Sequence, residues 1–184
     1  IMNNSLTKGA YYSDLKLYPA KNSVKLMNPL SEDLNVMRQT LLFGGLESLK
    51  RNMNYQSSNL RMFEFGNCYS CTKENHEENN PLNAYREAFH MGLWLTGKSV
   101  EGSWMHADEE SSFFQLKGYV EDILSRIGVN VAFLKMENES NEIFSSSIVL
   151  IDRGGKTVCR MGVVNKSQTE KLDISAPVYF AELN

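Results

Sequence analysis

Segments with the residue pattern of β-strands fill most of the chain after position 60, and this feature constrains its fold more than any other. Leu60–Tyr69 is apolar on both alternating faces, as expected of a central strand that is covered on two sides. Asp152–Gly155 is a hairpin turn signal. Other strands are expected at Glu87–Thr96, Val131–Met136, Ser145–Ile151, Thr157–Val164 and Val178–Leu183. Strands joined by tight turns, with few helices, predict an α+β domain: an antiparallel sheet flanked by helices.

Two segments instead carry the period of amphipathic helices. In the first, Leu42, Leu46, Leu49 and Met53 recur at spacings of 4, 3 and 4 residues and define one apolar face. The second runs near Ser112–Ile127, and the glycine that follows it suits a helix C-cap. Its expected buried stripe comprises Phe113, Leu116, Val120, Ile123, Leu124 and Ile127.

The composition argues against two classes of protein. The chain has no run of about 18 or more apolar residues, so we expect no membrane span. Its net charge of −3 is unlike that of a stand-alone nucleic-acid binder, whose affinity comes mainly from basic residues facing phosphates. Three cysteines, an odd number, indicate a reducing compartment, the cytoplasm, without a disulfide framework.

The length of 184 residues suits one domain with a sizeable core, and we expect residues 1–184 to form a single domain. The chain opens with Ile1 and Met2 and lacks the organisation of a signal peptide. We therefore interpret it as a fragment of a longer multidomain protein. One polar stretch, Lys73–Asn83, is expected to be an exposed loop between two strands.

Cys68-x-x-Cys71 is the spacing that most resembles a metal motif. A zinc site needs four ligands, however, and a second pair of this kind is missing. His76 could add one ligand, and the other candidates lie in unrelated segments: Cys159, His90 and His106. We therefore expect no metal site, and we interpret the two cysteines as small, half-buried residues at the end of a strand.

No residue spacing nominates a catalytic set. Gly44-Gly45 and Gly154-Gly155 lack the spacing of a phosphate-binding loop, and no Ser-His-Asp or Cys-His set can be nominated. Glu64 lies within an apolar strand, where an unpaired charge would cost several kcal/mol. We expect it to form a structural ion pair with Arg38 or Arg86; a catalytic role for this carboxylate is the alternative.

Short motifs follow one another along the chain in a characteristic order. They are Asn28-Pro29-Leu30-Ser31, Met37-Arg38-Gln39-Thr40-Leu41-Leu42, Asn52, Leu60–Gly66, Phe113–Gly118 with Val120-Glu121, Gly162–Val164 and Asp173-Ile174. Each motif alone is weak, but the ordered set is specific. It resembles the bacterial phenylalanyl-tRNA synthetase beta subunit family, in its class II synthetase-like module, from about Met2 to Leu183.

The chain departs from the pattern of this family at three places. Phe43 stands where the family usually has proline, and Gln115 replaces an aspartate. Asn165-Lys166 occupies a position where many members carry His-Pro. These differences concern loop geometry and leave the resemblance intact.

The resemblance implies a class II fold, whose catalytic members hold ATP and an amino acid on the sheet. Leu60–Cys68 resembles the motif 2 strand, after which an arginine normally holds the α-phosphate. Ser70 falls at that position, and Thr72 stands where a carboxylate is usual. The chain ends after Val178–Leu183, before the arginine of motif 3. We therefore expect no catalytic, cofactor-binding or metal-binding residues here, with ATP and magnesium used by the whole enzyme.

The resemblance also implies partners. The expected role is that of an inactive structural module of phenylalanine–tRNA ligase, which supports the alpha subunit in an (αβ)2 assembly and meets tRNA through the whole enzyme. The helices around Leu42–Asn54 and Phe113–Ile127 are candidate surfaces; core packing of their apolar stripes is the alternative. Two other hypotheses remain: an autonomous ATP-dependent ligase, and a free-standing interaction or RNA-binding module, against which the negative net charge argues.

Overall fold

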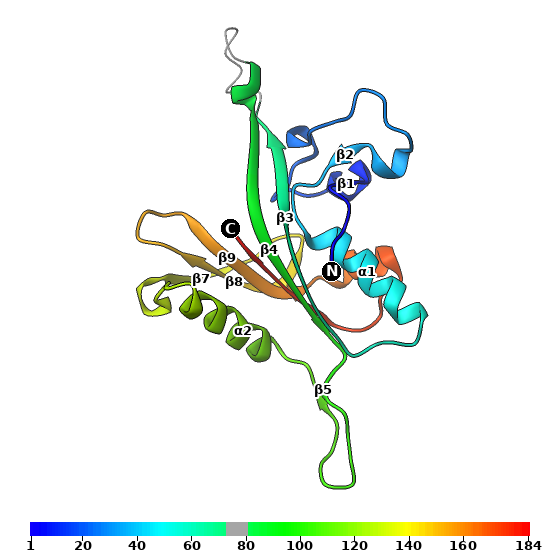
Figure 1. Ribbon diagram of the computed structural model, residues 1–184, viewed down its shortest axis with the longest axis vertical. Helices are drawn as coiled ribbons and strands as arrows, with labels where there is room; N and C mark the ends of the chain where they lie inside the picture. Colours follow the sequence, from blue (N-terminus) through cyan, green and yellow to red (C-terminus); the bar gives the residue numbers. More distant parts are fainter. Residues whose placement is uncertain (73–80) are drawn as a thin grey trace.

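A computed structural model describes residues 1–72 and 81–184 of the chain and places an antiparallel sheet at its centre (Figure 1). Six strands form this sheet in the order β3-β4-β10-β9-β8-β7. They are β3 (Leu60–Cys71), β4 (Tyr85–Thr96), β7 (Lys135–Glu139), β8 (Phe144–Ile151), β9 (Thr157–Val164) and β10 (Val178–Leu183). Helix α1 (Leu42–Asn54) and the N-terminal segment lie on one side of the sheet, and α2 (Phe113–Arg126) lies on the other. The predicted α+β architecture is confirmed.

Shorter elements complete the described part of the chain. Two small strand pairs join β1 (Leu6–Thr7) to β2 (Val36–Met37) and β5 (Lys98–Val100) to β6 (Glu109–Glu110). One short helix, α3, spans Lys166–Thr169. The 3₁₀ turns are Gly9–Tyr12, Ala20–Asn22, Glu32–Leu34, Pro81–Ala84, Val131–Phe133 and Glu170–Leu172. The predicted loop Lys73–Asn83 falls mostly outside the described residues, since only positions 81–83 of it belong to a described turn.

Strand β3 corrects the expectation of a central strand covered on both faces. It lies at the edge of the sheet and pairs only with β4 in that sheet, from Leu60 opposite Thr96 to Cys71 opposite Tyr85. One face packs into the core, whereas Phe63 and Phe65 on the other face are 54% and 55% exposed. The expectation was wrong because apolar residues on both faces indicate burial only when something covers each face.

The segment predicted as a strand at Val131–Met136 divides into two elements. Val131–Phe133 forms a 3₁₀ turn, because the Asn130 side chain accepts a hydrogen bond from the backbone N–H of Ala132 and so caps it. The strand β7 begins only at Lys135 and pairs with β8 as far as Glu139. The strand predicted here therefore exists, but it is shifted toward the C-terminus.

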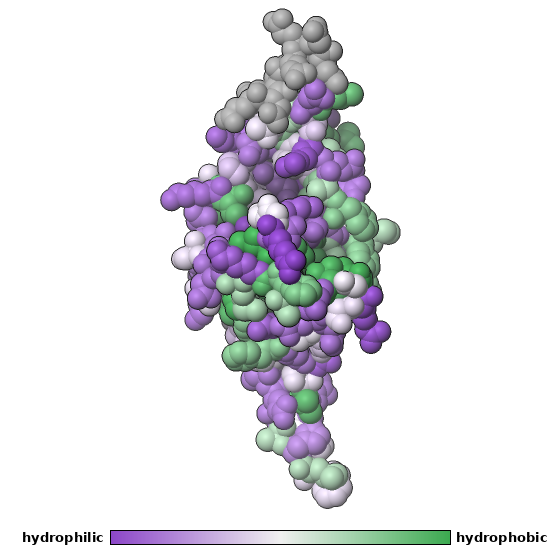
Figure 2. Space-filling model, turned by 90° about the vertical axis from the view of Figure 1, so that its left-hand side faces the viewer, coloured by the Kyte–Doolittle hydropathy of each residue, from purple (hydrophilic) through white to green (hydrophobic). Residues whose placement is uncertain are grey.

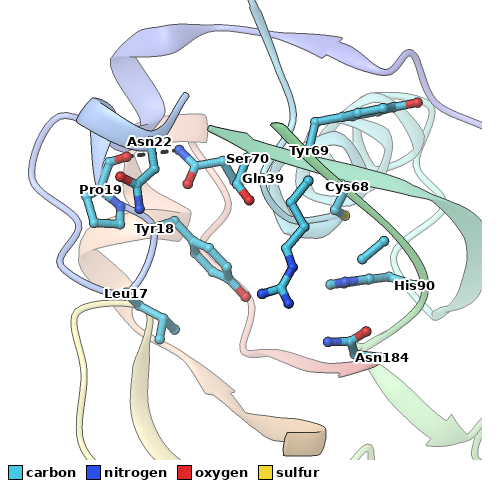
Figure 3. Close-up of a pocket in the computed structure, with 12 residues that line it drawn as sticks. Leu17, Tyr18, Pro19, Asn22, Gln39, Cys68, Tyr69, Ser70, His90 and Asn184 are labelled. Carbon is cyan, nitrogen blue, oxygen red and sulfur yellow. Dashed lines mark hydrogen bonds between the residues drawn. The ribbon is translucent and has the colours of Figure 1, made fainter. Parts of the chain in front are cut away.

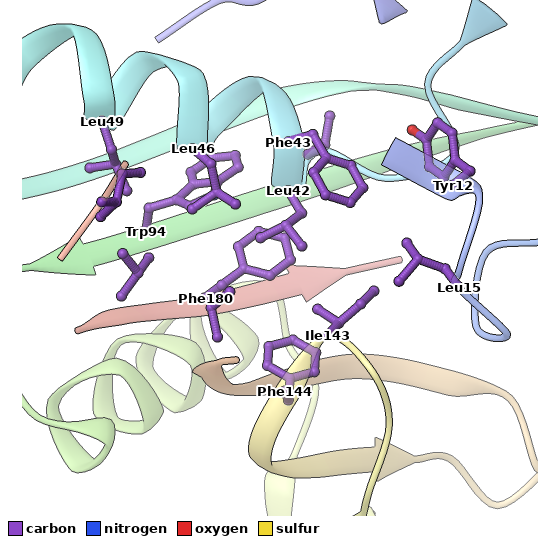
Figure 4. Packing of buried hydrophobic residues seen from close by; sticks show 14 of the residues in the cluster. Tyr12, Leu15, Leu42, Phe43, Leu46, Leu49, Trp94, Ile143, Phe144 and Phe180 are labelled. Carbon is purple, nitrogen blue, oxygen red and sulfur yellow. The ribbon is translucent and has the colours of Figure 1, made fainter. Parts of the chain in front are cut away.

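Helix α1 covers one face of the sheet with the apolar residues that the sequence predicted. Leu42, Leu46 and Leu49 are fully buried and point toward Trp94 and Phe180 of the sheet (Figure 4). Gly45 makes this close approach possible, because a Cβ atom there would lie 2.0 Å from Trp94 Cε2. The glycine that weakens the isolated helix is thus required by its packing.

Helix α2 covers the opposite face over β9 and β10. Leu116, Val120 and Leu124 are buried against the sheet, which confirms the core of the predicted stripe. Ile127, expected to be buried, is 66% exposed, because the helix ends at Arg126 and the chain turns away. Gly128 takes a left-handed φ of 85°, as expected of a helix C-cap.

The β8–β9 hairpin forms where the sequence predicted it. The carboxylate of Asp152 accepts hydrogen bonds from the backbone N–H groups of Gly154 and Lys156. Gly155 has a φ of 80°, a conformation that glycine adopts without steric cost. The turn thus sets the register of two neighbouring strands.

Three phenylalanines form an exposed aromatic strip on the α2 side of the β3–β4 edge: Phe63, Phe65 and Phe89. Phe89 is 66% exposed, and the ring centroids of Phe65 lie 6.0 Å from those of Phe63 and 6.1 Å from those of Phe89. Figure 2, which looks at the side of the molecule on the left of Figure 1, shows hydrophobic residues at the surface around the middle of the long axis. Part of the apolar surface of this domain is therefore left uncovered.

Candidate functional site

A cavity opens on the α1 side of the sheet, between the N-terminal segment and the β3–β4 pair (Figure 3). Its volume is about 240 Å³. The lining residues are Leu17, Tyr18, Pro19, Asn22, Gln39, Cys68, Tyr69, Ser70, Arg86, Ala88, His90 and Asn184. These residues come from five parts of the chain, so only the fold brings them together.

Glu182 lies buried beneath this cavity and organises the polar groups around it. Its Oε2 accepts hydrogen bonds from the Thr40 hydroxyl at 2.7 Å and the Tyr18 hydroxyl at 3.0 Å. Its Oε1 accepts one from the backbone N–H of Leu41 at 2.9 Å and lies 3.1 Å from His90 Nδ1. The Cys68 thiol donates to the same oxygen at 3.7 Å. A carboxylate this buried is held by several donors at once.

The ionisation of these groups follows from burial and from this network. Burial opposes ionisation of Glu182, but the hydrogen bonds from His90, Leu41 and Thr40 outweigh it and lower the pKa of the carboxyl below its ordinary value. Burial, with the neighbouring Glu182 charge, raises the pKa of the Cys68 thiol far above its usual range. The same two causes raise the pKa of the Tyr18 hydroxyl. The cluster thus holds one carboxylate among neutral thiol and phenol groups.

The structure redistributes the cysteines and histidines that the sequence singled out. Cys68 lies with His90 and Glu182, and their ligand atoms all fall within 4.8 Å of one another. Cys71 is not part of this group; Cys159 is buried in the core on the opposite face. The structure therefore groups Cys68 with residues of two other strands and not with Cys71. No local signal predicts the true group, because its members lie on three strands.

Glu64 has the structural role that was predicted for it. Its Oε1 lies 2.7 Å from Arg38 Nη1, and both side chains are buried. The other oxygen accepts a hydrogen bond from the Asn3 side chain, while Arg38 Nε donates to the backbone carbonyl of Asn67. Of the two arginines considered, Arg38 is the partner. The pair ties the N-terminal segment to β3.

Ser70 and Arg86 lie directly opposite each other on β3 and β4, and both line the cavity. The side chain of Arg86 forms no ion pair or hydrogen bond with any residue that the structure describes. An arginine therefore does reach the cavity, from the second strand of the pair. The position at which the resemblance places a phosphate-binding arginine holds a serine.

The whole chain, residues 1–184, matches the family described as phenylalanyl tRNA synthetase beta chain CLM domain. The chain belongs to this family. It is 49% identical over 184 residues to the phenylalanine–tRNA ligase beta subunit of Bacteroides fragilis, which covers 100% of the chain and 22% of that protein. It is 42% identical over 183 residues to the same subunit of Porphyromonas gingivalis, with the same coverage. The chain thus spans about a fifth of the length of these relatives.

Among solved structures, a pyrrolysyl-tRNA synthetase from Desulfitobacterium hafniense shares the fold. The TM-score is 0.66 at 16% identity, over 100% of this chain and 58% of that one. The fold is therefore that of a class II aminoacyl-tRNA synthetase, as the resemblance implied. None of the helices in the described part of the chain has the length and hydrophobicity needed to cross a bilayer.

Proposed function

We propose that this domain is a non-catalytic structural module of a phenylalanine–tRNA ligase beta subunit and that it supports the alpha subunit that joins phenylalanine to tRNA. Membership of the beta-chain family supports the parent enzyme. The observation that carries the structural role is Ser70 at the position expected for the motif 2 arginine. Removing one such charge-stabilising group typically costs about 3 kcal/mol of transition-state stabilisation.

The groups around the cavity also fit ATP poorly. Below the cavity, the Glu182 carboxylate is already occupied by donors from its own chain, including Thr40 and Leu41. Among the described lining residues, Arg86 is the only arginine or lysine, and no aspartate or glutamate lines the cavity to hold magnesium. We therefore assign the binding of ATP and magnesium to other parts of the whole enzyme.

The partner contact is expected on the aromatic strip. The apolar stripes of α1 and α2, at Leu46 and Leu116 for example, are fully buried within this chain, so they are not available to a partner. The aromatic strip is exposed and contiguous, which is the character of a protein-binding surface. We propose that it contacts the alpha subunit in an (αβ)2 assembly that works on tRNA in the cytoplasm.

Assembly of the ligase tests this role. A beta subunit from which the segment corresponding to this chain has been deleted should fail to form the complex with the alpha subunit, as measured by light scattering. A beta subunit with Phe63, Phe65 and Phe89 all changed to Ser should fold but assemble weakly. The matched control is Tyr55→Ser, which changes an aromatic residue that is 82% exposed elsewhere on the domain.

The outcomes separate the two statements. Normal assembly of the deletion variant would contradict the structural role. Normal assembly of the triple serine variant, together with failure of the deletion variant, would retain the role and move the contact away from the aromatic strip. Equal weakening by Tyr55→Ser would show that the serine effect is not specific to the strip.

One observation favours a second function, that of an ATP-dependent ligase in its own right. Arg86 lines the cavity without a described partner, and a free guanidinium suits an anionic ligand such as a phosphate. Calorimetric titration of the domain with ATP tests this. Binding that disappears in the Arg86→Ala variant would favour the second function, whereas equal, weak or absent binding in both proteins supports the structural role.

A further inference from the structure

Three potential metal ligands converge beneath the cavity from three adjacent strands. Cys68 lies on β3, His90 on β4 and Glu182 on β10, and these strands are neighbours in the sheet. Cys68 and His90 line the cavity on the α1 side of the sheet (Figure 3), and Glu182 lies on the same side, where it accepts hydrogen bonds from Thr40 and Leu41. A thiolate, an imidazole and a carboxylate are the donors that zinc uses in proteins.

Two of the three separations between these donors are close to those expected around one zinc ion, and all three donor atoms lie within 4.8 Å of one another. Tetrahedral coordination, with a Zn–S bond of about 2.3 Å and Zn–N and Zn–O bonds of about 2.0 Å, places sulfur about 3.5 Å from oxygen and nitrogen about 3.3 Å from oxygen. Cys68 Sγ lies 3.7 Å from Glu182 Oε1, and His90 Nδ1 lies 3.1 Å from that oxygen. Small side-chain movements therefore suffice to coordinate an ion.

The charge of the cluster also favours a cation. Glu182 is a buried carboxylate, and no lysine or arginine in the described part of the chain lies within ion-pair distance of it; Arg160, directly opposite it on β9, is paired with Glu139. Arg38, a buried arginine on the same side of the sheet, is paired with Glu64 instead. A divalent ion with the carboxylate and the Cys68 thiolate would form a neutral buried group.

The surroundings supply the other features of an open zinc site. Thr40 and Tyr18 donate hydrogen bonds to Glu182 Oε2 and hold the carboxylate in place, as outer partners of metal ligands do. The cavity above Cys68 and His90 leaves space for a water molecule as fourth ligand. From this donor set, charge and access we infer that Cys68, His90 and Glu182 bind one zinc ion with a water molecule in the fourth position.

Binding is balanced by the loss of one proton. The Cys68 thiol gives up its S–H proton to solvent through the cavity, and its sulfur then forms the bond to zinc. Glu182 binds as the carboxylate and His90 through its neutral Nδ1, with the ring proton on Nε2. The hydrogen bonds to Glu182 Oε2 and the Leu41 N–H bond to Oε1 persist, so the metal replaces only the contacts of Oε1 with Cys68 and His90.

Cobalt substitution tests the site in the full-length chain. After removal of metals with a chelator, Co²⁺ should produce a sulfur-to-cobalt charge-transfer band and the intense visible bands of tetrahedral coordination. Cys68→Ser should abolish the charge-transfer band. It should also weaken zinc binding by more than about 10–100-fold, because a loss of that size already follows from changing a residue that only hydrogen-bonds to a metal ligand. Cys71→Ser, a cysteine on the same strand, should leave both unchanged and is the matched control.

A charge-transfer band that is absent from the wild-type protein, or equal in the wild-type and Cys68→Ser proteins, would overturn the inference. If Cys68→Ser does not fold, X-ray absorption of the zinc-loaded wild-type protein decides the question. The site is supported if the zinc shell of the wild-type protein contains one sulfur and if the His90→Gln variant loses both this sulfur signal and the metal. A zinc shell of nitrogen and oxygen alone contradicts it.

Discussion

The two faces of the sheet solve the problem of burial in different ways. On the α1 side, buried charges lie within the core, and the Arg38–Glu64 ion pair and the Glu182 network hold distant segments together. On the α2 side, the core is apolar, and Leu116 is a representative residue of it. The helix there leaves the aromatic strip uncovered. Both faces bury an apolar helix stripe, and the α1 face adds these buried polar partners to it.

The difference indicates what each face is for. A polar network under a cavity is expected where a fold once served, or still serves, to bind a ligand, because such groups cost stability unless every partner is present. An apolar face with an exposed strip is expected where a second protein completes the core.

Removing one partner of the buried ion pair should cause the largest loss of stability. Arg38→Ala leaves Glu64 as an unpaired buried charge, which should lower the free energy of unfolding by about 3–5 kcal/mol. Urea denaturation measures this loss. Arg51→Ala, in the exposed last turn of α1, is the control and should change stability by less than about 0.5 kcal/mol. Equal losses of stability in the two variants would contradict the claim that buried polar partners stabilise the α1 face.

A cavity in the apolar face should have the next largest effect. Leu116→Ala should cost about 2–4 kcal/mol, through lost burial and the cavity left behind. Phe114, two residues earlier on the same helix, is 80% exposed, and Phe114→Ala should cost less than about 1 kcal/mol. Thermal unfolding followed by circular dichroism compares the two variants. A greater loss of stability with Phe114→Ala than with Leu116→Ala would show that the outer face of α2 is covered and that Phe114 belongs to the core.

The Glu182 network predicts a dependence of stability on pH. Because the folded pKa of this carboxyl lies below its unfolded value of 4.5, its contribution is present above that pH and is lost as the pH falls through the lowered value. Glu182→Gln should cost about 1–3 kcal/mol at neutral pH. The difference from wild type should shrink in acid. A difference that grows as the pH falls from 4.5 would contradict the direction of this shift.

Changes in the aromatic strip should have the smallest effect on the isolated domain. Phe65→Ser removes an exposed ring and its contacts with Phe63 and Phe89, so it should change the free energy of unfolding by less than about 1 kcal/mol. Chemical denaturation measures this value. A loss of several kcal/mol would show that the strip belongs to the core and not to a partner contact.

Local features of the sequence predicted much of this fold. The buried stripe of α2, the turn at Asp152–Gly155 and the pairing of Glu64 follow from periodicity, turn chemistry and the cost of burying a charge. Phe63 and Phe65 misled the prediction of a central strand, because an exposed aromatic strip has the same pattern as a covered one. Edge position depends on strand order, which no local pattern contains.

The cluster beneath the cavity lay beyond prediction for the same reason. Cys68, His90 and Glu182 are far apart in the chain, and they meet because β10 lies next to β4 in the sheet, although many residues separate these strands in the sequence. The motif spacing drew attention to Cys71 instead. Knowledge of the strand order would have identified the group.

Phenylalanine-dependent ATP–pyrophosphate exchange by the assembled ligase tests the central claim, that this domain has a synthetase fold without synthetase chemistry. The decisive comparison is between wild-type enzyme and an assembled enzyme that carries Arg86→Ala in this domain. The account predicts equal rates of exchange, because the reacting groups lie elsewhere. A loss of about 10²–10³-fold, the usual effect of removing a group that stabilises transition-state charge, would contradict it.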